Sequence, residues 1–272
     1  MPSLPRVSHF VIFIFAAAMA MASSPALPSQ TAKELIGDAC YNELQHRDRK
    51  TLWSYTAELH VNSHLFLEQV IETADGPVRH LLAMDGHPPT PAQTKEELGR
   101  QQELLKNPSG RRAAQKQRDD DDQTIEELLR VIPEAFVFED QGREEDFEKI
   151  AFHPNPGFRP RTYQQRIVHA LDGIVFIDLR DKRIARLSAS LASRVEFGRG
   201  LIGHVEQGGT AEITRVRLSP GVWKTSAEKI NIDGRFVIFK TISKHQDESR
   251  TGFAPVAPNT TFAQALDQTT KK

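Results

Sequence analysis

The sequence predicts an α+β protein whose main element is an antiparallel β-sheet, and two observations lead to this class. Segments with the two-residue alternation of half-buried strands recur between residues 55 and 243, and hairpin turn signals such as Asp75-Gly76 join several of them. Four other segments repeat apolar or charged residues at helical spacing. We therefore expect one sheet with helices packed on it.

The first predicted helix covers residues 31–47. Thr31 and Glu34 form a capping box, in which each side chain satisfies a free amide at the helix start. The basic run 46–50 closes the helix, where positive charge is favourable. An apolar face follows the cap at helical spacing, made by Leu35, Ile36, Ala39, Cys40 and Leu44. Because Cys40 lies on this face, we expect a buried, unreactive thiol.

Three strands should follow, at about residues 55–61, 65–71 and 78–84. Asp75-Gly76 predicts a hairpin turn between the second and third strands, since a type I′ turn needs positive φ at both central positions. The turn-rich segment 85–89 ends this meander.

A charged helical insertion is predicted at about residues 90–132. Its first helix starts at the capping sequence Thr90-Pro91-Ala92-Gln93 and ends at the breaker Asn107-Pro108-Ser109-Gly110. A second helix should run over residues 111–130 and stop at Pro133. We expect this insertion to pack on the sheet edge or to project from it.

Strands resume after the insertion. A short helix at residues 162–170 is capped by Thr162 and Gln165. Asp233-Gly234 predicts a hairpin turn between the last two strands. Residues 251–272 lack a period and are rich in Thr, Pro and Ala, so we expect a flexible C-terminal tail. The strands of this half are expected at about 135–138, 147–152, 173–179, 183–191, 210–218, 222–232 and 235–243.

The first 22 residues have the pattern of a secretory signal peptide. Arg6 precedes the apolar run 11–21, and Ala20-Met21-Ala22 supplies the small residues that signal peptidase reads before Ser23. The run is shorter than the roughly 20 residues that a membrane span needs. The residue directly after the cleavage site is Ser23 and not Cys, so a lipid anchor is not expected. The sequence thus predicts a periplasmic or secreted protein after cleavage near Ala22.

Composition excludes some classes of function. Lys and Arg number 35 against 36 Asp and Glu, for a formal net charge of −1, whereas a general nucleic-acid binder would carry a basic excess. Cys40 is the single cysteine, so no internal disulfide can form. The fold must therefore depend on an ordinary hydrophobic core of one large domain, or at most two.

No motif assigns a catalytic, cofactor or metal site. Residues 198–203 match G-x-G-x-x-G, but Gly208-Gly209 would break the helix that a dinucleotide site requires, and no acidic residue follows at the right distance. We interpret these glycines as backbone bends, bulges or a tight loop between strands. The four aspartates Asp119 to Asp122 lack the spacing of a calcium-binding loop. We expect them to be a solvated run of charge that stabilises an adjacent helix N-terminus. His60 and His64 lie about 13 Å apart along a strand, too far to share one metal.

Basic and aromatic residues alternate near the C-terminal strands, at Trp223-Lys224, Phe239-Lys240 and Lys244. Two interpretations stay open. Aromatic side chains can face inward while lysines reach outward from a half-exposed sheet. Alternatively, this rim contacts anionic lipid head groups, which would allow peripheral membrane contact.

The segments Leu171–Asp178 and Lys182–Leu187 resemble the middle strands of the LolA/LolB-like superfamily of periplasmic lipoprotein-sorting proteins. The order of helix, meander, helical interruption and further meander over residues 30–248 is also similar to that superfamily. The C-terminal half resembles a group of secreted bacterial proteins through residues 195–203, 208–210, 222–225 and 239–242.

This resemblance implies a strongly bent antiparallel sheet, or half-barrel, over residues 23–250, with helices 31–47 and 162–170 packed on its concave face. It also implies non-enzymatic binding of a hydrophobic ligand, such as a lipid or the acyl chains of a lipoprotein, without a cofactor. The fifteen Phe could equally form a solid core. Candidate residues of the ligand groove are Leu35, Ile36, Ala39, Trp53, Tyr55, Phe176, Trp223 and Phe239.

Two other functions stay open. The charged insertion could bind an envelope protein partner, as in a scaffold or a stress sensor. A hydrolase with an unrecognised site is the third alternative.

Overall fold

The structure, a computed structural model, describes residues 30–45, 51–61, 63–197, 203–236 and 242–270. The chain divides into a unit over Met1–Gln30 and a compact unit over Thr31–Lys272, which carries all the features below. The predicted signal peptide and its cleavage site lie outside the described residues, as do the basic run 46–50 and Phe239.

Five helices and twelve strands make up the described part of the chain. The helices are α1 (Ala32–Gln45), α2 (Pro91–Lys106), α3 (Pro108–Ala135), α4 (Tyr163–His169) and α5 (Phe262–Thr270). The first six strands are β1 (Leu52–Val61), β2 (His64–Ile71), β3 (Val78–Met84), β4 (Phe136–Glu144), β5 (Phe147–Pro154) and β6 (Leu171–Asp178). The others are β7 (Arg183–Leu191), β8 (Val195–Phe197), β9 (Gly203–Val205), β10 (Thr210–Ser219), β11 (Val222–Phe236) and β12 (Ile242–Val256).

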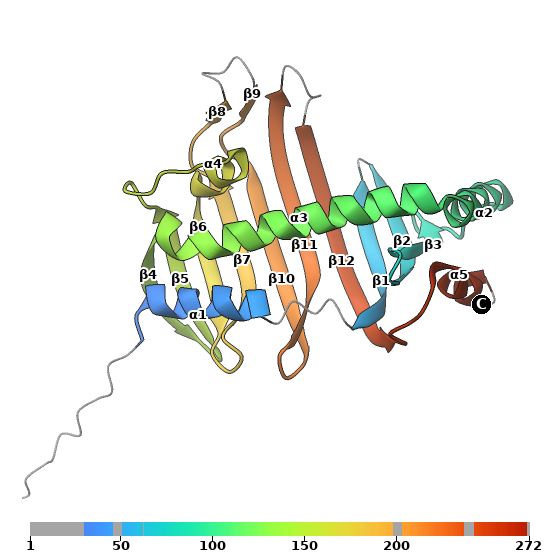
Figure 1. Ribbon diagram of the computed structural model, residues 1–272, viewed down its shortest axis with the longest axis horizontal. Coiled ribbons are helices and arrows are strands. Elements are labelled where there is room, and N and C mark those ends of the chain that lie inside the picture. Colours follow the sequence, from blue (N-terminus) through green and yellow to red (C-terminus); the bar gives the residue numbers. More distant parts are fainter. Residues whose placement is uncertain (1–29, 46–50, 62, 198–202, 237–241, 271–272) are drawn as a thin grey trace, which may run out of the picture. The chain divides into compact units, whose positions relative to one another are not determined.

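All twelve strands belong to one antiparallel sheet that does not close on itself (Figure 1). The strand order is β3-β2-β1-β12-β11-β10-β7-β6-β5-β4, with β8 and β9 as a side branch on β11. The C-terminal strand β12 pairs with the N-terminal strand β1, so the two ends of the strand sequence meet in the middle of the sheet. The predicted α+β class with a large antiparallel sheet is therefore confirmed.

Helices α1 and α3 lie side by side against one face of the sheet (Figure 1). Between α1 and strands β4 to β7 lies the largest core cluster. Its buried members are Leu35, Ile36, Ala39, Cys40, Ala135, Phe136, Ile150, Phe152, Val175, Ile177 and Ala189. Within the described ranges, no helix is both long and apolar enough to cross a membrane.

Three predicted helix starts are confirmed by their capping contacts. In α1, the Thr31 amide donates to the Glu34 carboxylate at 2.8 Å, and the Glu34 amide donates back to Thr31 Oγ1 at 3.2 Å. Thr90 caps α2 with Gln93 in the same way. Thr162 caps α4 by accepting from the Gln165 amide at 3.1 Å. These local signals are readable from sequence because each involves residues three apart.

The predicted end of the second insertion helix is wrong. Helix α3 starts at Pro108 and continues through Pro133 to Ala135. Asn107 alone separates it from α2, and its side chain caps α3 by accepting from the Gly110 amide at 2.8 Å. Proline lacks an amide hydrogen, but two residues before the helix end it removes only one backbone hydrogen bond, so the helix can continue to Ala135.

The acidic run at Asp119 to Asp122 lies inside α3 and not at a helix N-terminus. The helix starts at Pro108, about three turns before the run. Gln115 and Gln117 each donate a hydrogen bond to an aspartate one turn later, at 2.9 Å. The run is part of a solvated helix face.

Helix α2 covers the outer edge of β3. The Leu81 amide donates to the Glu97 carboxylate at 3.2 Å, and Gln101 Nε2 donates to the Arg79 carbonyl at 2.6 Å. Both side chains of α2 are buried, at 8% and 3% exposed. An uncovered edge strand offers its backbone to other chains. Helix α2, the first half of the charged insertion, thus protects one edge of the sheet. Packing on the sheet edge was one of the two predicted placements of the insertion.

The Asp233-Gly234 turn prediction is also wrong. Both residues lie within β11, where Gly234 pairs with Ile242 of β12 and with Val205 of β9. A β-carbon at Gly234 would lie 2.8 Å from the His204 carbonyl oxygen. Glycine is needed here because two backbones approach closely, which looks in the sequence like a turn signal.

The described part of the C-terminal segment, residues 251–270, contains the end of a strand and a helix, so the predicted flexible tail over 251–272 is wrong. Strand β12 extends to Val256, and α5 follows after a cap in which Thr261 and Gln264 exchange hydrogen bonds. Phe262 and Ala265 of α5 are buried against Ile71 and Val78. This T-x-x-Q cap was readable in the sequence.

Replacing Phe262 with alanine should lower the free energy of unfolding by about 3 kcal/mol, because a large side chain only 4% exposed leaves a cavity. Gln268→Ala, on the exposed side of α5, is the control and should change it by less than about 0.5 kcal/mol. Urea unfolding of the full chain measures both. Equal stabilities of the two variants would mean that α5 does not pack on the sheet.

Candidate functional site

An apolar cavity of about 110 Å³ lies between the helices and the sheet. Only apolar parts of side chains form its wall. The lining residues are Ile36, Ala39, Cys40, Ile132, Phe136, Phe138, Phe152, Val168, Leu171, Val175, Ile184, Leu187 and Ala189.

Helical and strand periods explain how these residues converge. Ile36, Ala39 and Cys40 are three and four apart on α1 and therefore share the face toward the sheet. Leu187 and Ala189 of β7 are two apart and share the face toward the helices. Ile132 from α3 and Val168 from α4 close the cavity from the helix layer. The prediction of a buried Cys40 is confirmed, and burial together with the Glu43 charge raises the pKa of its thiol to about 12.

The structure brings together only some of the predicted groove residues. Ile36 and Ala39 line the cavity, and Leu35 is buried in the same core. Trp53 and Tyr55 belong to a separate core cluster with Ala57 and Val70. Their strand β1 is far from β4 to β7 in the strand order, which sequence spacing could not show.

Phe176 and Trp223 have other surroundings. Phe176 alternates with the cavity-lining Val175, and the guanidinium of Arg186 stacks 3.9 Å from its ring centre. Trp223 is buried and its indole Nε1 donates to Asp181 at 2.9 Å. Both therefore lie outside the cavity. The sequence analysis did not select Ile132 of α3 or Val168 of α4, although both line the cavity.

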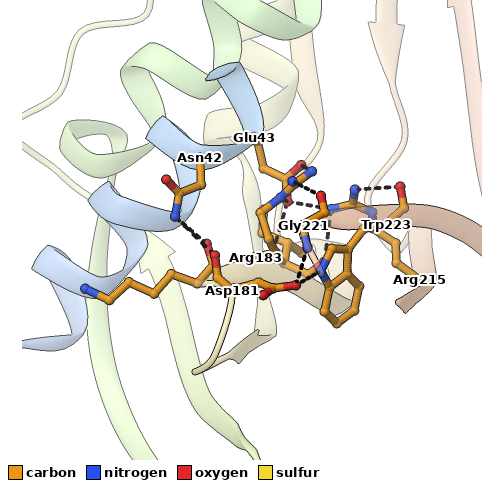
Figure 2. A network of polar contacts seen from close by, with 9 residues as sticks. Asn42, Glu43, Asp181, Arg183, Arg215, Gly221 and Trp223 are labelled. Atoms are coloured by element: carbon orange, nitrogen blue, oxygen red, sulfur yellow. Dashed lines mark hydrogen bonds and ion pairs between the residues drawn. The ribbon is translucent and has the colours of Figure 1, made fainter. Parts of the chain in front are cut away.

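A polar network lies at the C-terminal end of α1 (Figure 2). Glu43 lies one helical turn beyond Cys40. Arg183 donates to both of its carboxylate oxygens, at 2.9 and 2.7 Å, and Arg215 donates to it as well. The side chains of Glu43, Arg183 and Arg215 are 11%, 4% and 15% exposed. Arg215 also donates to the carbonyl of the lining residue Ile184 at 3.0 Å.

Burial by itself would raise the pKa of Glu43. The hydrogen bonds and positive charges of Arg183 and Arg215 outweigh burial, so this pKa lies below the usual range and the carboxylate is ionised. The network therefore fixes the end of α1 to β7 and β10. Both α1 and β7 supply residues that line the cavity.

Asp181 forms the second half of the network, in the turn between β6 and β7 (Figure 2). It accepts from Arg217 Nε at 2.7 Å, from the Trp223 indole at 2.9 Å and from the Gly221 amide at 3.0 Å. The Arg217 hydrogen bond is the main reason why the pKa of Asp181 falls to about 2. Asn42 of α1 donates to the Asp181 carbonyl at 3.2 Å and so connects the helix to this turn.

The opposite sheet face has an open cleft of about 410 Å³, lined among others by His153, Asp172 and Ser190. Ser190 Oγ donates directly to the Asp172 carboxylate at 3.0 Å. In a serine-hydrolase triad a histidine stands between the serine and the acid. These three residues are therefore not arranged for nucleophilic catalysis.

The fold and this site define an α+β protein in which helices cover one face of an open antiparallel sheet above an apolar cavity. Comparisons with protein-family models, with curated proteins and with solved structures found no significant match to this chain.

Proposed function

We propose that this protein binds a hydrophobic ligand, without chemically changing it, in the cavity between α1, α3, α4 and the sheet. The observation that carries the proposal is the wholly apolar wall of that cavity. Native cores are packed to the density of organic crystals and leave few such spaces. An apolar cavity stays dry and takes up apolar molecules readily.

The cavity volume limits what can enter the structure as it stands. An apolar cavity of about 150 Å³ holds benzene, whereas pockets for larger ligands span about 300–1,000 Å³. The 110 Å³ here therefore suits the terminal carbons of an acyl chain. A longer chain would require α1, α3 and α4 to move away from the sheet, and burial of the acyl chain would offset the weaker packing of these helices.

The LolA-like half-barrel, the lipid or lipoprotein ligand and the periplasmic location belong to the same proposal. Two segments carry the resemblance, and they form β6 and β7. Those strands supply five lining residues of the cavity: Leu171, Val175, Ile184, Leu187 and Ala189. The location rests on the N-terminal 22 residues alone.

Binding of an envelope protein through the insertion is the second candidate. Leu104 and Leu105, near the end of α2, are 42% and 36% exposed. They would be the apolar centre of such a contact.

Neutral primary alcohols of four to twelve carbons test the cavity. At 100 times its dissociation constant, a ligand of the folded state adds about 2.7 kcal/mol of stability, which should raise Tm by about 5–10 °C. Ala39→Leu fills the cavity from α1 and should abolish this shift. Ala114→Leu, on the exposed side of α3, should keep it. Thermal unfolding with and without alcohol measures each shift against the variant's own baseline. If no alcohol stabilises the wild type, the ligand-binding proposal fails and the protein-partner candidate leads.

A further inference from the structure

We propose that the outer edge of β4 binds an extended segment of another protein that carries basic side chains, by adding it to the sheet as a further strand. This interaction is independent of the apolar cavity and of the ligand proposed for it.

The two edges of the sheet are treated differently. At the β3 edge, the outward Leu81 amide and Arg79 carbonyl are bonded by Glu97 and Gln101 of α2. Strand β4 is the other edge and pairs with β5 only (Figure 1). Among the described residues, no side chain or backbone group bonds the outer side of β4 over residues 137–141.

The register shows which backbone groups of β4 point outward. The Asn155 amide donates to the Ala135 carbonyl at 2.9 Å, and the pairing continues with Phe136 opposite Pro154. In an antiparallel pair, hydrogen-bonded and non-bonded residue pairs alternate. Val137 and Glu139 therefore bond β5, and the amides and carbonyls of Phe138 and Asp140 face away from it.

The side chains on this edge favour a basic partner. Glu139 and Asp140 are both exposed, and Asp140 lies close to Glu148 of β5. Burial, a hydrogen bond that protonated Glu148 donates to Asp140, and the negative charge of Asp140 together raise the pKa of Glu148, and Arg143 only partly offsets this rise. Negative charge is therefore in excess at this edge. Opposite charges on neighbouring strands stabilise their pairing.

Apolar contact is also available on this edge. Phe138 is half-buried on the face of β4 opposite to that of Glu139, so a strand with alternating valine and lysine would place its valines beside Phe138 and its lysines beside Glu139. A second copy of this chain fits less well, because β4 against β4 would bring two acidic strands together.

Fluorescence anisotropy with labelled acetyl-Lys-Val-Lys-Val-Lys-amide tests the proposal on the full chain. The wild type should bind this peptide, and methylating the valine amides should weaken binding at least about tenfold, because strand addition needs those donors. Glu139→Lys should weaken binding about fivefold or more. Glu212→Lys, an identical charge change at an exposed position in the middle of the sheet, is the control and should leave it unchanged.

Each other outcome overturns the proposal. No binding by the wild type excludes the site, and equal affinity for the methylated peptide would indicate electrostatic adhesion without strand pairing. Equal affinity for acetyl-Glu-Val-Glu-Val-Glu-amide would exclude recognition of basic side chains. Concentration-dependent dimerisation that Glu139→Lys abolishes would assign the edge to a second copy.

Discussion

Replacing Glu43 with glutamine should lower the free energy of unfolding by about 3–5 kcal/mol, the largest effect that we expect from a polar substitution. The change keeps the side-chain shape but leaves Arg183 and Arg215 without their carboxylate. Both guanidinium groups are largely buried, at 4% and 15% exposed, so water cannot replace the missing partner. Urea unfolding at pH 7 measures the loss.

Asp38→Asn is the matched control, because it removes one carboxylate from the same helix. Asp38 pairs with Lys182 at 2.5 Å, but the two side chains are 46% and 40% exposed. We expect a loss below about 1 kcal/mol, since solvent screens exposed pairs. Similar losses for the two variants would contradict a structural role for the buried network.

The effect of Glu43→Gln should depend on pH. The folded-state pKa of Glu43 lies below its usual range, so its contribution is complete above the unfolded pKa of about 4.3 and is lost as the pH falls through the lower folded value. The stability gap between wild type and variant should therefore be constant from pH 7 to about pH 5 and narrow below it. A gap that widens in acid would contradict this assignment.

Replacing Gly173 with alanine should destabilise the fold by about 3 kcal/mol or more. A β-carbon at this position of β6 would lie 2.0 Å from the Ser188 carbonyl oxygen of β7. This neighbour is backbone, so a strand must shift to relieve the clash. Leu171 and Val175, on either side of Gly173, line the cavity, so binding of the alcohol probes should also weaken.

Gly99→Ala provides the control for Gly173→Ala. Gly99 lies inside α2, and a β-carbon there would meet nothing within 4 Å. Alanine should stabilise this helix by up to about 1 kcal/mol. Thermal or urea unfolding of the two variants should therefore show changes of opposite sign. If Gly173→Ala is neutral, the two strands are not as close as described.

Signals that depend on neighbouring residues were reliable in the sequence. The capping residues of α1, α2 and α4 predict their helix starts, because the donor and acceptor lie within one turn. Thr261 and Gln264 carry the same kind of capping signal. They mark the start of α5, inside the segment that was wrongly predicted to be a flexible tail. Apolar spacing also identified Ile36 and Ala39 as facing the sheet, and both line the cavity.

Signals that depend on distant strands could not be read. Asp233-Gly234 has the composition of a turn, yet its glycine serves the close approach of β9, whose position depends on tertiary pairing. Trp53 and Phe176 are aromatic residues on strands like those that line the cavity. Trp53 lies on β1, which is far from the cavity in the strand order, and Phe176 lies on the sheet face opposite to that of the cavity-lining Val175.

By itself, the sequence determined the α+β class, most element boundaries and the buried face of α1, since these follow from hydrogen bonds and periodicity within short segments. The tertiary structure alone decided that β12 pairs with β1 and that Glu43 meets two arginines from β7 and β10. It also decided that an apolar cavity remains beneath the helices. Interactions between residues that are distant along the chain depend on how the whole chain packs, and local patterns carry no record of that.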